Sequence, residues 1–275
     1  MSKKFKPIEE LTIRDNFMFV KVFSNPEIAL PFLKALLKIE IEKVSIVGEA
    51  QQQADPRKKY VRFDVLVREN GADGTNNVGR VFDLEMQMVD TQELPLRARY
   101  YQGICDVETL GNGISYKKLK DQYVIFLCPE DIFGKERPIY EFENREKNDH
   151  SLALGDHTYK FFLNFSKYGA VTDESVRDYL KYFATGEATS DATRAIQNQV
   201  NYYHKDPKTR SDYMTFEAML EEEREEGRAE GRAEGRAEGE SLKNRELAKG
   251  FRDDGVPLDI ISKRTGLTPE EIKAL

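Results

Sequence analysis

The sequence predicts a mixed α/β fold with a helical C-terminal extension. Two β-prone runs, 60–70 and 81–89, are joined by Asn-Gly and Asp-Gly turn signals, which predicts an antiparallel hairpin. Segments with helical spacing lie before the hairpin at 14–40 and after it at 93–110. The continuously apolar run at 122–128 predicts a further, fully buried strand. The order helix, hairpin, helix, strand is typical of a mixed α/β domain.

Composition indicates a folded protein of one sizeable domain plus appendages. The chain has 275 residues, of which 39% are hydrophobic and 11% aromatic. Two cysteines, Cys105 and Cys128, are too few for a disulfide framework and favour a reducing compartment. The first residues hold no apolar signal segment, and no apolar run approaches the length of a membrane span. We therefore expect a soluble, cytoplasmic protein with no membrane partner.

The net charge of −7 is unevenly distributed. Residues 221–240 hold nine Glu and four Arg, which contribute −5, so the rest of the chain carries only −2. A nearly neutral body neither excludes nor favours a nucleic-acid partner.

The elements can be justified in chain order. In 14–40, apolar residues at helical spacing predict two helices that are broken at Asn25-Pro26. A short strand follows at 44–48. The helix at 93–110 carries one apolar stripe, formed by Leu96, Tyr100, Ile104, Val107 and Leu110, which leaves Arg97 beside it.

The second half of the chain begins with further strand signals and ends in helices. Strand signals recur in 138–166, and helical spacing returns over 173–205. Residues 216–240 form a Glu/Arg/Gly-rich segment, and its part 221–240 carries a repeat of period four. Each Gly weakens a helix by about 1 kcal/mol relative to Ala, and Arg and Glu two positions apart do not face each other. A flexible or marginally helical linker is therefore favoured over a helix that packs through a glycine ridge.

Residues 241–275 have helix punctuation of their own. Gly255 and Pro257 separate a first helix from a second, and Thr268-Pro269 places a cap and a first-turn proline before a third. This is a small three-helix module with the rhythm of a helix-turn-helix. Its last helix begins with two glutamates, a poor surface for phosphates. Both DNA binding and protein contact remain open, and protein contact is favoured.

The hairpin holds the strongest candidate site. Asp64 lies within FDVLV, while Glu85 and Gln87 share the polar face of DLEMQ. Adjacent strands are about 4.8 Å apart, so the two carboxylates can reach one cation if the register pairs them. Mg²⁺ binds oxygen and keeps several waters, so two carboxylates suffice, with the Met86 carbonyl as a third ligand. Gln87 could orient the attacking water. The alternative is that these polar residues form an ordinary solvated strand face, since an Asp followed by Glu-x-Gln also occurs by chance.

Several segments together resemble a known family. They are DNFMFVKVF near the start, FDVLV followed by DLEMQ, the LPLRARYYQG helix, and the terminal IISKRTGLTPEEIKAL. With this order and separation, the chain resembles the Rpn family of recombination-promoting nucleases and transposases, within the PD-(D/E)XK nuclease superfamily. The resemblance covers nearly the whole chain.

The resemblance implies a restriction-endonuclease-like core, a mixed sheet flanked by helices, over residues 1–215. A linker or helix at 216–240 and the helical module at 241–275 would follow. It implies a DNA endonuclease that depends on Mg²⁺, or alternatively Mn²⁺, and that is linked to recombination or mobile elements. Asp64 matches the motif Asp and Glu85 the second acid.

The chain departs from the superfamily pattern at Gln87, which stands where Lys is usual. The missing cation could come from Lys58, Lys59 or Arg97. Arg97 could equally be an exposed arginine, or it could contact phosphate or pack against the site.

Two further acids have alternative roles. Asp15 could reach the metal site from the first helix, or it could be that helix's N-cap, which is favoured. Asp83 could be a second metal ligand on the face of Glu85, although an edge carboxylate is favoured.

The competing function is a catalytically weak or inactive nuclease fold that acts as a regulatory or protein-interaction module. The missing Lys and the acidic tail favour it. The expected partners are DNA and a second copy of the chain. The family also suggests a short C-terminal product, starting at Met214 or Met219, that inhibits or dimerises with the full chain.

Overall fold

The computed structural model describes the chain except residues 1–4, 48–50, 53–60, 71–77 and 111–112. It divides into two compact units, Met1–Tyr213 and Met214–Leu275. The helices longer than one turn are α1 Asn16–Phe23, α2 Pro26–Leu37, α3 Leu94–Thr109, α4 Glu174–Thr185, α5 Asp191–Lys205, α6 Pro207–Asp253, α7 Leu258–Thr265 and α8 Pro269–Ala274. The strands are β1 Val44–Val47, β2 Gln51–Gln52, β3 Val61–Arg62, β4 Val65–Asn70, β5 Val78–Met86, β6 Gln122–Cys128, β7 Ile139–Phe142 and β8 Thr158–Asn164. In the described residues, no helix is both long and apolar enough to cross a membrane.

A mixed sheet forms the centre of the first unit. Its six strands lie in the order β1-β4-β5-β6-β8-β7, and β2 and β3 form a separate pair. The expected hairpin is confirmed, because β4 and β5 are antiparallel. The predicted buried strand is also confirmed as β6, which runs parallel to β5 and to β8. The fold is therefore the mixed sheet flanked by helices that the sequence predicts.

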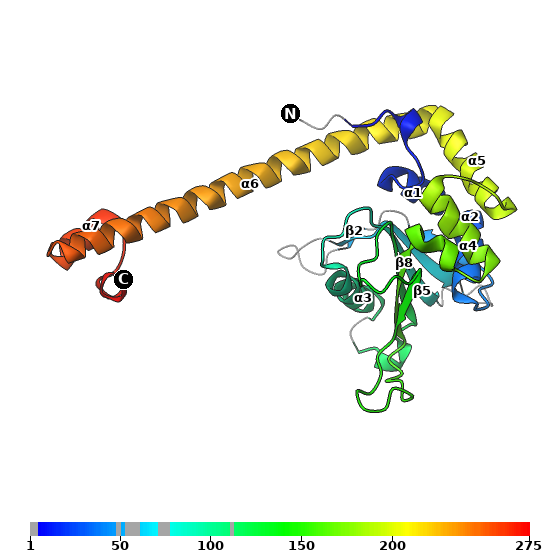
Figure 1. Cartoon of the computed structure of the whole chain (residues 1–275), viewed down its shortest axis with the longest axis horizontal. Helices are drawn as coiled ribbons and strands as arrows, with labels where there is room; N and C mark the ends of the chain where they lie inside the picture. Colours follow the sequence, from blue (N-terminus) through cyan, green and yellow to red (C-terminus); the bar gives the residue numbers. More distant parts are fainter. Residues whose placement is uncertain (1–4, 48–50, 53–60, 71–77, 111–112) are drawn as a thin grey trace. The chain divides into compact units, whose positions relative to one another are not determined.

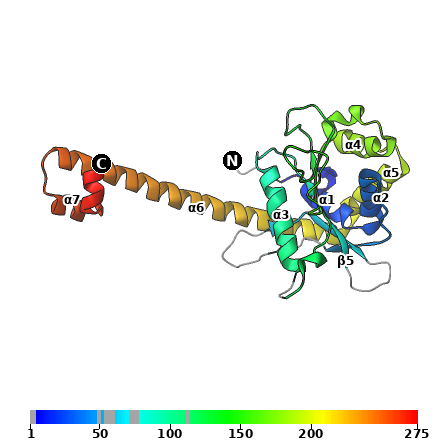
Figure 2. The same ribbon diagram turned by 90° about the horizontal axis from the view of Figure 1, so that it is seen from below.

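Helices cover both faces of this sheet. Helix α3 connects the parallel strands β5 and β6 and lies on one face, while α1, α2, α4 and α5 gather on the other (Figures 1 and 2). On the α3 face, Leu94 and Ala98 pack with Val124 and Phe126 of β6. On the other side, tilted and edge-on rings join α1, α2 and α4 through Phe23, Phe32 and Phe183.

The break between the first two helices is confirmed at the predicted residues. Helix α1 ends at Phe23 and α2 begins at Pro26. Asn25 accepts a hydrogen bond from the Glu27 amide, so it satisfies one of the free N–H groups at the start of α2. Pro26 occupies the first helical position, where its missing N–H is not needed.

The predicted apolar stripe on α3 is wrong. Leu96 and Val107 are 57% and 61% exposed. The buried positions on α3 are Leu94, Ala98, Tyr101, Gln102, Ile104 and Cys105. Two sets of residues on α3 have helical spacing, and the set that includes Leu94, Ala98 and Cys105 packs against the sheet. With this face of α3 against the sheet, Arg97 also points toward the sheet, where it contacts Glu85 and Gln87.

The glycine repeat is helical in the structure, which favours the helical over the flexible form of the expected linker. Helix α6 runs without interruption from Pro207 to Asp253. The residues before Gly227 and after Gly239 are long glycine-free segments, and a helix already formed on both sides extends through weak positions between them. Ion pairs one turn apart support the two ends of the repeat, Arg224 with Glu221 and Arg236 with Glu240.

The second unit contains most of α6, and at its far end a small helical module forms where the end of α6 packs with α7 and α8. Its core consists of Ala248, Ile261 and Ile272. Helix α7 ends at Gly266, which has a φ of 75°. Thr268 begins α8 with a capping box to Glu271, as the sequence predicts.

Candidate functional site

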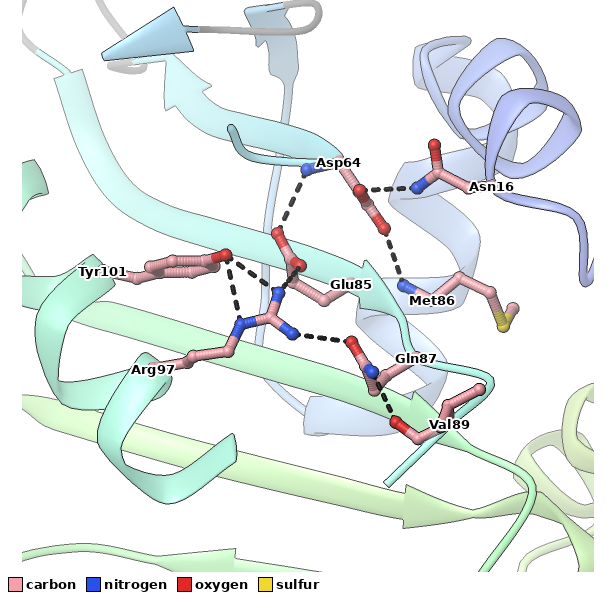
Figure 3. A network of polar contacts seen from close by, with 8 residues as sticks. All are labelled: Asn16, Asp64, Glu85, Met86, Gln87, Val89, Arg97 and Tyr101. Carbon is pink, nitrogen blue, oxygen red and sulfur yellow. Dashed lines mark hydrogen bonds and ion pairs between the residues drawn. The ribbon is translucent and has the colours of Figure 1, made fainter. Parts of the chain in front are cut away.

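The register of the hairpin places two acids opposite each other. Val65 of β4 pairs with Leu84 of β5, so Asp64 lies opposite Glu85. The Asp64 amide donates to Glu85 Oε1 at 3.1 Å, and the Met86 amide donates to Asp64 Oδ2 at 3.0 Å (Figure 3). The two strands therefore hold the carboxylates next to each other through their own backbone groups. The Met86 carbonyl as a cation ligand stays a prediction.

Asn16, at the start of α1, also contacts Asp64. Its Nδ2 donates to Asp64 Oδ1 at 2.6 Å. The sequence reasoning missed this residue and weighed Asp15 instead. Asp15 occupies the N-cap position without capping the helix, and its carboxylate accepts hydrogen bonds from Thr12 and Lys6. The family-like segment DNF was a signal for this helix start, but it did not indicate which of its polar residues faces Asp64.

Arg97 on α3 binds the remaining polar groups of the hairpin. Its Nη2 lies 3.1 Å from Glu85 Oε2, and its Nη1 donates to Gln87 Oε1 at 2.7 Å. Nη2 and Nε also donate to the Tyr101 hydroxyl, at 2.8 and 3.3 Å. The guanidinium lies over the rings of Tyr101 and Phe126. Of the interpretations open for Arg97, packing against the site is thus the observed one, and its side chain is 28% exposed.

Gln87 is fixed from both ends. Its Oε1 accepts from Arg97 and its Nε2 donates to the Val89 carbonyl at 2.5 Å. The amide orientation is therefore set by one cation and one backbone carbonyl. Lys58 and Lys59, the other candidate cations, lie outside the described residues.

Asp83 is a third acid on the same face, and its expected place at a solvated edge is wrong. Asp83 and Glu85 are each only 2% exposed, because β5 is a central strand and α3 covers this face. In the described part of the chain, no hydrogen-bond donor reaches either carboxylate oxygen of Asp83.

Burial and nearby negative charge raise the pKa values of Asp83 and Glu85. Burial raises the pKa of Asp83 well above its usual range, and the negative charge of Asp64 adds to this. Burial likewise raises the pKa of Glu85, with further contributions from Asp83 and Asp64 that Arg97 only partly offsets. Burial and the charge of Glu85 raise the pKa of Tyr101 to about 12, so its hydroxyl stays protonated beside Arg97.

The chain belongs to the PD-(D/E)XK nuclease family transposases. A sequence model of that family matches residues 13–243, which include every residue of the network described above. No significant match to the chain exists among curated proteins or solved structures.

PD-(D/E)XK nucleases generally use divalent metals, and the residues present fit such an ion chemically. Asp64, Glu85 and Asp83 offer only oxygen, the ligand atom that Mg²⁺ and Mn²⁺ accept readily. In the part of the chain that the structure describes, the two oxygens of buried Asp83 lack a hydrogen-bonding partner. Within the same residues, however, no three His, Cys, Asp or Glu side chains already stand together as a formed metal centre.

Proposed function

We propose that the chain is a divalent-cation-dependent endonuclease that hydrolyses phosphodiester bonds in DNA, in a role linked to recombination or mobile elements. The observation that carries the proposal is the pairing of Asp64 with Glu85 across β4 and β5, in a chain of a nuclease family. Asp64 and Glu85 would hold Mg²⁺, with Mn²⁺ as the alternative. When bound, this ion activates water and neutralises charge on the scissile phosphate.

The neighbouring side chains supply the other roles. Gln87 has an oriented amide that can position the attacking water. Arg97 provides the positive charge that the superfamily pattern places at position 87, since its guanidinium contacts both Gln87 and Glu85. A guanidinium can bind two phosphate oxygens at once, so Arg97 would stabilise the charge that builds up during hydrolysis.

One observation favours a second candidate, a regulatory protein on an inactive nuclease fold. All four carboxylate oxygens of Asp64 and Glu85 already accept a hydrogen bond from the protein, from Asn16, Met86, Asp64 and Arg97. A network that is satisfied in this way can be purely structural. It predicts normal folding and no cleavage in any metal.

Plasmid nicking separates the two candidates. The full chain is incubated with supercoiled DNA in Mg²⁺, Mn²⁺ or EDTA, beside the variants Asp64→Asn and Glu85→Gln. The matched control is Asp106→Asn, because Asp106 of α3 is a partly buried acid that bonds Gln122 away from the site. The nuclease proposal expects cation-dependent nicking by the parent chain and the control, and a loss of at least about 10²-fold in both site variants. No nicking by the parent chain, or equal nicking by all four, would contradict it.

Two partner assignments remain predictions. A homodimer would supply two sites for cutting both strands. A short product that begins at Met214 would coincide with the second compact unit, which starts at that residue.

A further inference from the structure

We infer that Asp83 is a third carboxylate ligand of the same divalent cation that Asp64 and Glu85 hold. This inference rests on the proposed cation site and adds a residue to it. The supporting observations are the position of Asp83 on β5, its lack of a hydrogen-bond donor among the described residues, and the excess of negative charge around it.

Asp83 is a buried carboxylate with apolar residues on both sides of it in the sheet. In the sheet register its neighbours are Leu66 of β4 on one side and Val124 of β6 on the other. Leu66 belongs to an apolar cluster that α3 closes with Tyr101 and Cys105. The thiol of Cys105 is only a weak donor, and among the described residues the Tyr101 hydroxyl, which accepts from Arg97, makes no hydrogen bond to Asp83. A buried, unpartnered carboxylate is strongly unfavourable unless something of opposite charge joins it.

The charges of the cluster do not balance. Asp64, Asp83 and Glu85 present three carboxylates, and Arg97 is directed at Glu85. Asp83 and Glu85 are two positions apart on one strand, so their Cα atoms are about 7 Å apart and their side chains share a face. When all three acids are ionised, a divalent ion between these carboxylates would cancel the remaining two charges and give the Asp83 oxygens a partner.

In the described residues the three acids do not already stand together as a formed metal centre, so binding as inferred here needs their side chains to turn toward the ion. The alternative is that Asp83 has a structural role in which it carries a proton and bonds Glu85. Under that alternative, cation binding would not depend on Asp83.

Cation affinity of the full chain tests the inference without relying on cleavage. Mg²⁺ and Mn²⁺ are titrated by calorimetry into the parent chain, Asp83→Asn, Asp83→Leu and the control Asp106→Asn. The inference expects Asp83→Asn to weaken affinity at least about tenfold and Asp83→Leu to weaken it further, with the control unchanged. Without cation, both Asp83 variants should melt at the same temperature as the parent or higher, because they remove a buried acid whose oxygens have no hydrogen-bonding partner among the described residues. Parent-like affinity in both Asp83 variants would overturn the inference.

A second measurement uses the parent chain alone, so it does not depend on whether an Asp83 variant folds. With aspartate carboxyl groups labelled by ¹³C, the infrared difference between Mg²⁺ and EDTA should show two aspartates changing in the parent chain. A change in one aspartate only would sink the inference. If affinity falls in Asp64→Asn and Glu85→Gln but not in the Asp83 variants, Asp83 is excluded and the proposed site stands. If all three acids bind the ion but DNA is never cut, the proposed function fails and the Asp83 assignment stands.

Discussion

Arg97 Nη1 donates to Gln87 Oε1 at 2.7 Å, so the amide at position 87 is the partner of a cation rather than a substitute for one. The pair joins α3 to the end of β5, and the guanidinium also lies over Tyr101 and Phe126. The positive charge at the site therefore arrives from a helix, and the strand supplies only its acceptor.

This relationship predicts a dependence between positions 87 and 97. Arg97→Met should lower cleavage roughly 10²-fold, because the site loses its cation. Gln87→Lys alone should also lower cleavage, since it places an ammonium beside the guanidinium. The double variant should recover part of the loss of Arg97→Met, because the lysine introduced at position 87 then stands alone as the cation. The double-mutant cycle compares initial rates of plasmid nicking by the parent chain, the two single variants and the double variant. Melting temperatures of all four proteins control for folding. Additive losses would contradict the assigned pairing.

Asn16 should matter for the site more than for the fold. Asn16→Ala removes the donor to Asp64 Oδ1, and loss of such a supporting hydrogen bond typically lowers cation affinity or activity about 10- to 100-fold. The matched control is Asn25→Ala, which removes the cap of α2 and should lower the free energy of unfolding by about 1 kcal/mol with little effect on cleavage. Calorimetric cation titrations and chemical unfolding of both variants check the contrast, and the reverse pattern would refute it.

The ion pair between Glu69 and Arg80 predicts a pH dependence of stability. Arg80 Nε and Nη2 lie 2.8 and 2.7 Å from the two Glu69 oxygens, and these hydrogen bonds lower the pKa of Glu69. A carboxyl with a lowered folded pKa stabilises the protein above its unfolded pKa of about 4.3, and this contribution is lost as the pH falls through the folded pKa.

Glu69→Gln should therefore reduce the free energy of unfolding by roughly 1 kcal/mol at neutral pH and by less in acid. Urea unfolding between about pH 7 and pH 3 measures this difference. Glu42→Gln, at an exposed position, serves as the control. A Glu69→Gln deficit that is the same at both ends of the pH range would show that the charge of Glu69 is not responsible.

The glycines of α6 predict a gain in helix stability on substitution. A Cβ added at Gly231 or Gly235 meets nothing within 4 Å, so Ala should stabilise the local helix by about 1 kcal/mol at each position. Hydrogen exchange of the amides in 227–239 should slow about fivefold per substitution. Gly266→Ala is the opposite case, because a φ of 75° strains any residue with a Cβ, so this variant should destabilise the second unit. Unchanged exchange in the repeat would contradict the helix assignment.

The sequence predicted the hairpin and the pair Asp64 and Glu85, because strand alternation fixes the face of every residue once the apolar partners are known. It did not predict the orientation of α3. Both faces of α3 carry apolar side chains, and contacts with the sheet bury the face of Leu94 rather than that of Leu96 and Val107. Whether Arg97 and Asn16 face the site depends on how α3 and α1 are rotated about their axes. The sequence pattern along a single helix does not specify that rotation.

Asp83 shows the same limit within a strand. Its polar character indicated a solvated edge, whereas burial depends on β5 being central and on α3 lying above it. Only the assembled layers decide whether a carboxylate on a strand meets water or an apolar cluster.

Most of the network comes from one short stretch of chain. Glu85, Gln87, Arg97 and Tyr101 follow one another from the end of β5 into α3, and Asp64 and Asn16 come from elsewhere. An exchange of residues 83–101 between related genes would therefore transfer Glu85, Gln87, Arg97 and Tyr101 together. Chimeras with crossover points outside residues 83–101 should keep these contacts. A crossover between Gln87 and Arg97 would combine Arg97 with acceptors from a different parent.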